Sequence, residues 1–384
     1  MDKNLAIKLN SALFGLDVKG GEINYISHAH SDHSYAMKDS APIFCSDATA
    51  QMLSLDFNGK NKEETEISPN TKTINKKILT AKKNIENKES PLLKEGAKAH
   101  PAKENFSGRQ NKISKRKKAS PKRIQIPNGF SLHNAGHILG STQLCADTQE
   151  FGKFVYTGDF KLRDGLTVKK APIIECDTLV MECTYGKTGV SFPPPQEVYE
   201  SMEKWSRQNK NSIQLWGGYA TGKAQELVKF INTYLDEAPI VPEKVAKICS
   251  HYKNNGISLD YVQAGTYEAQ EIMRSAFCAV FPPHQLNYNF ASQLSHAHRR
   301  EAKVAIATGW TGIRRMSAHA SFPLSDHADF GEILRYAQES GAKKVYLAHG
   351  KNESTAKELQ KEGINAFAIE ELGKKKEMQA ILQN

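Results

Sequence analysis

The stretch His28-Ala29-His30-Ser31-Asp32-His33 decides the fold of this 384-residue chain, because it places three imidazoles and a carboxylate within six positions. Imidazole and carboxylate groups are the usual protein ligands of zinc and similar cations. Residues 23–27 just before it predict a short strand, so the cluster stands at a strand end. Such a loop can divide its ligands between two metal ions about 4 Å apart. A polar surface loop with chance histidines is the alternative.

Further acids and histidines are predicted where other short strands end. Apolar runs lead into ligand-type residues three more times: 154–156 before Asp159, 178–181 before Glu182, and 344–348 before His349. His137 lies in a second glycine-flanked cluster at 134–141, and His327 precedes a predicted helix. Side chains at the ends of neighbouring strands meet at one edge of a sheet, where active sites gather. We therefore expect these residues to converge on the histidine loop.

The bulk composition is that of a water-soluble protein with two domains. Apolar residues make up 39% of the chain, the mean hydropathy is −0.55, and no apolar run approaches the roughly 20 residues of a bilayer span. The first residues lack the apolar core of a signal peptide. The six cysteines are scattered without a CxxC pair, which indicates neither a disulfide framework nor a thiolate zinc site. We expect a reducing cytoplasm and no membrane contact.

A basic segment differs in composition from the residues on either side of it. Between Asn58 and Gln125 stand 19 Lys and Arg against 7 Asp and Glu, so the net charge of +10 is concentrated there. The segment is poor in aromatic residues and peaks at Lys115–Lys118. Such a composition predicts a disordered insertion at about 60–125, with a weak helix near 74–85. Either it is a functionless linker or it is an arm that attracts phosphates and makes binding salt-dependent.

Helices and strands alternate between residues 191 and 309. The sequence predicts, in order, a helix at 196–207, a strand at 212–216, a glycine loop at 217–222, a helix from Lys223, and a strand at 303–308. The loop and the helix start at Lys223 could present N–H groups and a cation to a substrate phosphate, although a plain tight turn fits equally well. Arg314 and Arg315 are comparable candidates for phosphate contacts.

These motifs together resemble the β-CASP nucleases of the metallo-β-lactamase superfamily. The histidine loop is typical of the superfamily, and β-CASP proteins share the ordered series His137, Asp159, Glu182 in ECTYG, His327 in SDHADF and His349 in LAHG. The segments NAGHILGST, YTGDF, GKAQEL and ATGW are similar to those of archaeal mRNA 3′-end processing factors and of bacterial ligase-associated DNA exonucleases. The resemblance implies an α/β fold (α+β in some schemes) with four αββα layers. That core would comprise 1–190 and 310–384, with a β-CASP domain inserted at 191–309.

The resemblance also implies a role for each site residue. His28, His30 and His137 would hold a first metal, Asp32, His33 and His349 a second, and Asp159 would bridge both. Asp17 corresponds to the acid of the family's first motif. Two Zn²⁺ are expected, with Mn²⁺ as the alternative, and together they make hydroxide available near neutral pH. His327 would give the leaving oxygen its proton with Glu182 as its partner. The predicted catalytic set is therefore Asp32, His327 and Glu182.

The function implied is hydrolysis of phosphodiester bonds by a two-metal nuclease. A histidine at position 349 is typical of the RNA-directed branches, which favours RNA processing. The ligase-associated DNA exonucleases share this histidine, so DNA is the alternative, and endonuclease or exonuclease action stays open. A small-molecule hydrolase or a catalytically silent nucleic-acid scaffold would also be compatible with the fold. Expected partners are nucleic acid and either a second copy in a homodimer or subunits of a processing complex.

Overall fold

The structure is a computed structural model, and it describes residues 5–10, 12–54 and 121–372. The chain divides into a unit of residues 1–61 and 120–384, which contains every described residue, and a unit of residues 62–119. The basic insertion and its weak helix lie outside the described residues apart from 121–125. No helix of the described part is both long and apolar enough to cross a membrane.

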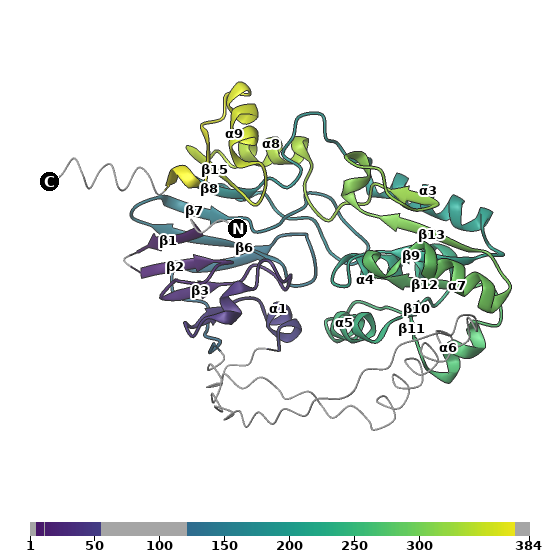
Figure 1. Cartoon of the computed structure of the whole chain (residues 1–384). Helices are drawn as coiled ribbons and strands as arrows, with labels where there is room; N and C mark the ends of the chain where they lie inside the picture. The colour runs from purple at the N-terminus through teal and green to yellow at the C-terminus, as the bar shows by residue number, and fades with distance from the viewer. Residues whose placement is uncertain (1–4, 11, 55–120, 373–384) are drawn as a thin grey trace, which may run out of the picture. The chain divides into compact units, whose positions relative to one another are not determined.

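Two sheets carry the histidine loop and the strand ends that follow it (Figure 1). The smaller one contains, in spatial order, β1 (Ala6–Leu9), β2 (Ala12–Leu16), β3 (Ile23–Tyr25) and β4 (Ile43–Phe44). The larger one has the order β16 (Ala366–Ala368), β15 (Lys344–Ala348), β8 (Thr178–Glu182), β7 (Gly152–Tyr156), β6 (Thr142–Thr148) and β5 (Phe130–Asn134). From β16 to β7 its strands run parallel, whereas β6 and β5 are antiparallel to their neighbours.

The two sheets pack face to face, and helices cover their outer faces. One apolar cluster joins the sheets through Phe14, Tyr25, Phe154, Val180 and Tyr346, among others. On the other face of the larger sheet lie α8 (Phe330–Glu339) and α9 (Asn352–Lys361), which contribute to a second cluster. The short helices η2 (Tyr35–Lys38) and α1 (Asp47–Met52) cover the smaller sheet through a third. This α/β arrangement confirms the predicted metallo-β-lactamase fold.

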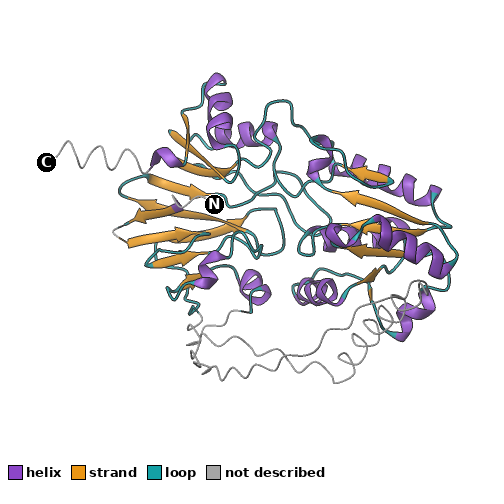
Figure 2. Cartoon of the chain, viewed as in Figure 1, coloured by secondary structure: helices purple, strands orange, loops and turns teal. Residues whose placement is uncertain are grey.

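A third sheet is parallel throughout, with helices on two sides (Figure 2). Its order is β11 (Val262–Gln263), β10 (Ile240–Val241), β12 (Cys278–Phe281), β9 (Ile213–Gly217), β13 (Ala302–Ala307) and β14 (Ala320–Phe322). Strands buried on both faces need apolar side chains on both, and β9 is buried at all of its positions. The helices and short turns around this sheet are α3 (Pro195–Gln208), α4 (Lys223–Phe230), η3 (Ile231–Leu235), α5 (Glu243–Asn254), α6 (Tyr267–Ile272), η4 (Pro283–Gln285), α7 (Tyr288–His298) and η5 (Gly309–Gly312).

The predicted elements match the observed ones to within one or two residues. The helix expected at 196–207 is α3, the strand at 212–216 is β9, and the strand at 303–308 is β13. The predicted division at 190 and 309 stays a prediction, because the described residues cluster as one unit and β14 of the third sheet lies at 320–322.

Strand topology brings the expected site residues to one edge of the larger sheet. The strands β7, β8 and β15 are parallel neighbours, and Ala348 pairs with Glu182 at the ends of β15 and β8. Asp159 follows β7 by three residues and His349 follows β15 directly. Because carboxyl ends of parallel strands share one edge, these side chains reach the same space.

Candidate metal centre

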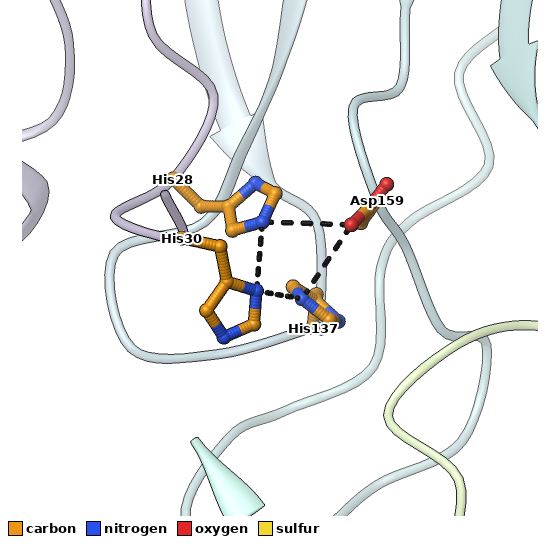
Figure 3. A group of neighbouring side chains, drawn as sticks. All are labelled: His28, His30, His137 and Asp159. Carbon is orange, nitrogen blue, oxygen red and sulfur yellow. Dashed lines mark hydrogen bonds and ion pairs between the residues drawn. The ribbon is translucent and has the colours of Figure 1, made fainter. Parts of the chain in front are cut away.

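Four side chains form a tight group that could hold a cation (Figure 3). His30 Nδ1 lies 3.1 Å from His28 Nε2 and 3.1 Å from His137 Nε2. Asp159 Oδ2 lies 3.5 Å from His28 Nε2 and 3.7 Å from His137 Nε2. With Zn–N bonds near 2.0 Å, ligand nitrogens of a tetrahedral site stand about 3.3 Å apart. The spacing of this group therefore matches one metal ion.

Backbone acceptors set the tautomers of two of these histidines. His30 Nε2 is 3.1 Å from the carbonyl oxygen of Thr221, and His137 Nδ1 is 2.9 Å from that of Asp326. A carbonyl oxygen only accepts, so the outer nitrogen of each ring carries the proton. In the neutral ring the inner nitrogen is then unprotonated. His30 Nδ1 and His137 Nε2 thus face each other with bare lone pairs.

Two hydrogen bonds of the Ser27 hydroxyl set the tautomer of His28. The Ser27 hydroxyl donates to Asp17 Oδ2 at 2.6 Å, so it accepts from His28 Nδ1 at 2.9 Å. His28 Nε2 is then unprotonated and points into the group. Burial is the main cause that lowers the pKa of His28, and it lowers the pKa of His30 and His137 in the same way. Neutral rings are the form that binds metal.

Three converging lone pairs with no proton between them repel one another unless a cation lies among them. Asp159 adds a carboxylate whose Oδ1 is buried and has no hydrogen-bond partner among the described residues. Burial would raise the pKa of Asp159, but His33 and His327 hold it well below its usual value. The residues present therefore fit a divalent metal ion with nitrogen and oxygen ligands.

A second group adjoins the first through Asp159. It consists of Asp17, His33 and His349, whose ligand atoms also lie within 4.8 Å of one another. His33 Nε2 is 3.2 Å from Asp159 Oδ2, and His33 Nδ1 is 2.9 Å from Asp17 Oδ2. Burial lowers the pKa of His33, but these two carboxylates outweigh it and raise the pKa well above its usual value. Asp159 therefore faces both groups.

His349 occupies the far side of this second group. Its Nε2 is 2.8 Å from the Tyr156 hydroxyl, which donates to Asp17 Oδ2 at 2.8 Å. Burial and the nearby His33 lower the pKa of His349. Among the predicted ligands, Asp32 alone lies outside both groups, and its side chain is exposed in the turn after His30. Asp17 stands with His33 and His349 instead.

His327 and Glu182 form a dyad at the edge of the first group. His327 Nδ1 is 2.8 Å from Glu182 Oε1 and 4.0 Å from Asp159 Oδ2. Glu182 is fully buried, and the amides of Phe160 and Thr184 donate to its carboxylate. Burial lowers the pKa of His327, but Glu182 and Asp159 more than compensate and raise it to about 9. A protonated imidazole thus stands beside the candidate metal group.

The chain is similar to several known proteins, although no protein-family model matches it. A probable DNA ligase of Opitutus terrae is 30% identical over 63% of this chain and 24% of its own length. A probable RNase MJ4 of Methanocaldococcus jannaschii is 28% identical over 60% of this chain and 50% of its own length. A transcription termination factor FttA of Methanothermobacter thermautotrophicus is 28% identical over 62% of this chain and 35% of its own length. The chain belongs to the β-CASP family of metallo-β-lactamase proteins.

The chain spans half or less of the length of each of these relatives. Among solved structures, a protein of unknown function from Enterococcus faecalis has a TM-score of 0.48 and 14% identity over 85% of this chain and 75% of its own.

The three predicted phosphate contacts of this β-CASP chain differ in their surroundings. Lys223 is 2% exposed, and its Nζ lies 2.6 Å from Asp326 Oδ1 and 3.0 Å from Glu226 Oε2. Burial would lower the pKa of Lys223, but the two carboxylates raise it. Its ammonium is therefore engaged inside the fold, which corrects the expectation that it reaches a substrate. Arg314 and Arg315 are exposed.

Several residues that shape the β-CASP site were missed by sequence reasoning. Tyr156 connects Asp17 with His349, and Ser27 sets the tautomer of His28. Arg163 contacts Asp329 and Glu332, the capping box that starts α8 just after His327. A tyrosine at a strand end or an arginine in a loop gives no local signal of this kind, because the partners lie far away in sequence.

Proposed function

We propose that this chain is a metal-dependent phosphodiesterase that hydrolyses nucleic acid, with RNA favoured over DNA. The observation that carries the proposal is the convergence of three unprotonated imidazole nitrogens and a buried carboxylate beside the pair His33 and His349. A group that collects lone pairs in this way is built for cations rather than for an organic ligand.

The residues divide the binding of two ions between them. His28, His30 and His137 hold the first, His33 and His349 hold the second with Asp32 or Asp17, and Asp159 faces both. We propose Zn²⁺ as the resident ion, with Mn²⁺ as the alternative. Two bound dications supply Lewis acidity for a phosphate oxygen and lower the pKa of a water.

His327 supplies the proton that the leaving oxygen needs. Its Nδ1 proton is held by Glu182, which orients the ring and stabilises the imidazolium. The side chain is 22% exposed, so its other nitrogen can meet a substrate. A proton donor at this position contributes typically about 10²- to 10⁴-fold to the rate. The fully buried Glu182 has a positioning role in this scheme.

The preference for RNA rests on the relatives. Two of them are named as an RNase and a transcription termination factor, and a further relative from Methanocaldococcus jannaschii is named as RNase J-like. A DNA exonuclease of the ligase-associated type is the second candidate, because the relative that matches 63% of this chain is named as a probable DNA ligase. We further propose a cytoplasmic location and assembly as a homodimer or within a processing complex.

End-labelled substrates test the proposal. The full chain is incubated with Zn²⁺ or Mn²⁺ and with single-stranded RNA or DNA of the same sequence, with and without EDTA. We expect metal-dependent cleavage, faster on RNA, and the position of the first products distinguishes endonuclease from exonuclease action. His28→Ala should be inactive, whereas the control His296→Ala, an exposed histidine on α7, should match the wild type.

Other results of this assay, combined with a binding measurement on the same substrates, would contradict the proposal and point to another function. Cleavage of DNA alone selects the second candidate. Binding of nucleic acid without any cleavage points to a silent scaffold, and neither binding nor cleavage points to a small-molecule hydrolase.

A further inference from the structure

Two aromatic side chains stand at the edge of the third sheet that faces the metal centre. Strands β9 and β13 are parallel neighbours, and Gly217 at the end of β9 pairs with Ile306. Tyr219 follows β9 by two residues, and Trp310 follows β13 by three. Because the carboxyl ends of neighbouring parallel strands share one edge, both aromatic residues leave the sheet on the same side.

The loop that carries Tyr219 contacts the metal centre directly, and Trp310 reaches its edge through Tyr185. Thr221, two residues after Tyr219, accepts the hydrogen bond of His30 Nε2 at 3.1 Å. The ring of Trp310 lies 5.1 Å from that of Tyr185, which in turn lies 5.9 Å from the ring of His327. The aromatic pair therefore borders both a metal ligand and the candidate proton donor.

Tyr219 and Trp310 also offer surface to a ligand. Tyr219 is 52% exposed, and Trp310 is partly exposed. The guanidinium of the exposed Arg314 lies 5.5 Å from the Trp310 ring centre, a cation–π distance. Unlike Lys223, whose charge is neutralised inside the fold, Arg314 and its neighbour Arg315 carry their charge at the surface.

The Trp310 ring is held in place by its neighbours. Tyr185 is 3% exposed and packs so close to Gly309 that a Cβ there would lie 2.6 Å from its hydroxyl oxygen. Thr308 caps the short turn η5 by accepting from the Trp310 amide. A ring that packs on a buried side chain and is carried by a capped turn loses little entropy when a ligand stacks on it.

We propose that Tyr219, Trp310 and Arg314 form a stacking subsite for the unpaired nucleobases on either side of the bond that is cleaved. Aromatic rings and arginine planes are the groups that stack on splayed bases of single strands. Stacking is tolerant of sequence because every base has a π face, so the subsite selects single strands rather than a particular sequence. The inference rests on the proposed function, since it names the form of nucleic acid that the metal centre receives.

Binding without cleavage tests the subsite. The full chain is titrated in EDTA into a fluorescent single strand of about 12 nucleotides, a length within the range that such sites cover. Trp310→Ala, Tyr219→Ala and Arg314→Ala are each expected to weaken binding by about 5- to 100-fold, the effect of losing one stacked base. The control is Tyr267→Ala, a 75% exposed tyrosine on α6, which packs near the outermost strand β11. It should bind like the wild type.

Abasic substrates make the test independent of folding. One abasic nucleotide moved along the strand should weaken wild-type binding at a few positions, and Trp310→Ala should lose that position dependence. Trp310→Phe should restore part of it.

Two failures are distinguishable. If the wild type cleaves single strands with metal but abasic sites and the three variants change nothing, the subsite is wrong and the proposed function stands. If the wild type cleaves no nucleic acid with either ion, the proposed function itself fails.

Discussion

Replacing Lys223 by Met distinguishes between two roles for this residue: it either contacts a substrate phosphate or stabilises the fold as a buried cation. Its ammonium lies 2.6 Å from Asp326 and 3.0 Å from Glu226, and all three groups are nearly inaccessible. At an effective dielectric constant of about 20, each pair gains about 6 kcal/mol of Coulomb attraction. Each ion costs several kcal/mol of desolvation, so the intact triad is worth little net, but removing the cation leaves two buried carboxylates without it. We therefore expect Lys223→Met to lower the free energy of unfolding by about 3–5 kcal/mol.

Urea unfolding followed by circular dichroism measures this loss. Lys204→Met is the matched control, because Lys204 is exposed on α3, and it should change stability by less than about 0.5 kcal/mol. Adding Glu226→Gln and Asp326→Asn to Lys223→Met should recover part of the loss, since the buried charges are then gone. A Lys223→Met protein with wild-type stability and a raised KM for nucleic acid would refute this reasoning and restore the phosphate role.

The interaction between Lys223 and Asp326 should also make the stability of the protein depend on pH. Burial would raise the pKa of Asp326, but Lys223 and Lys161 hold it below its usual value. A carboxyl with a depressed folded-state pKa stabilises the protein above its unfolded pKa of about 3.9, and this contribution is lost as the pH falls through the folded value. The difference in stability between the wild type and Lys223→Met should thus shrink in acid below about pH 4.

The remaining predictions concern the metal centre and its supports. His327→Ala should lower kcat by about 10²- to 10⁴-fold with its metal content unchanged, whereas Asp159→Ala should lose metal as well; equal metal loss in both, measured by mass spectrometry, would contradict their separate roles. Gly222→Ala should destabilise the start of α4, because Gly222 has φ +88° and a Cβ would lie 2.3 Å from Ile138; Gly256→Ala, with φ +84° and open space around it, is the control that isolates the clash in thermal unfolding. Arg163→Ala should reduce activity and stability together, because Asp329 and Glu332 lose the cation beside the start of α8; normal values for both would show that the cap alone holds His327.

Local patterns predicted most of the residues that gather in the two candidate groups, together with the strands that lead to them. Three histidines in six positions are informative by themselves, and short apolar runs before Asp159, Glu182 and His349 predicted strand ends that the structure brings together. The helices α3 and α4 were likewise predicted, because prolines stand where α3 begins and a glycine loop precedes α4.

The rest depends on contacts between distant parts of the chain. Lys223 and Asp326 are 103 residues apart, so nothing near Lys223 showed that its charge would be buried. The relay from Asp17 through Ser27 and the packing of Trp310 on Tyr185 need the folded sheets to exist first. Asp32 shows that a local pattern can also predict too much. Its motif predicts a metal ligand, but its exposed side chain lies outside both groups.

The most direct test of the central claim is the metal content of the full chain after reconstitution with Zn²⁺ and removal of free ion. The three converging imidazoles on one side of Asp159, with His33 and His349 on its other side, predict two ions per chain, with nitrogen ligands near 2.0 Å in the X-ray absorption spectrum. A protein that stays folded and holds no zinc would contradict the account.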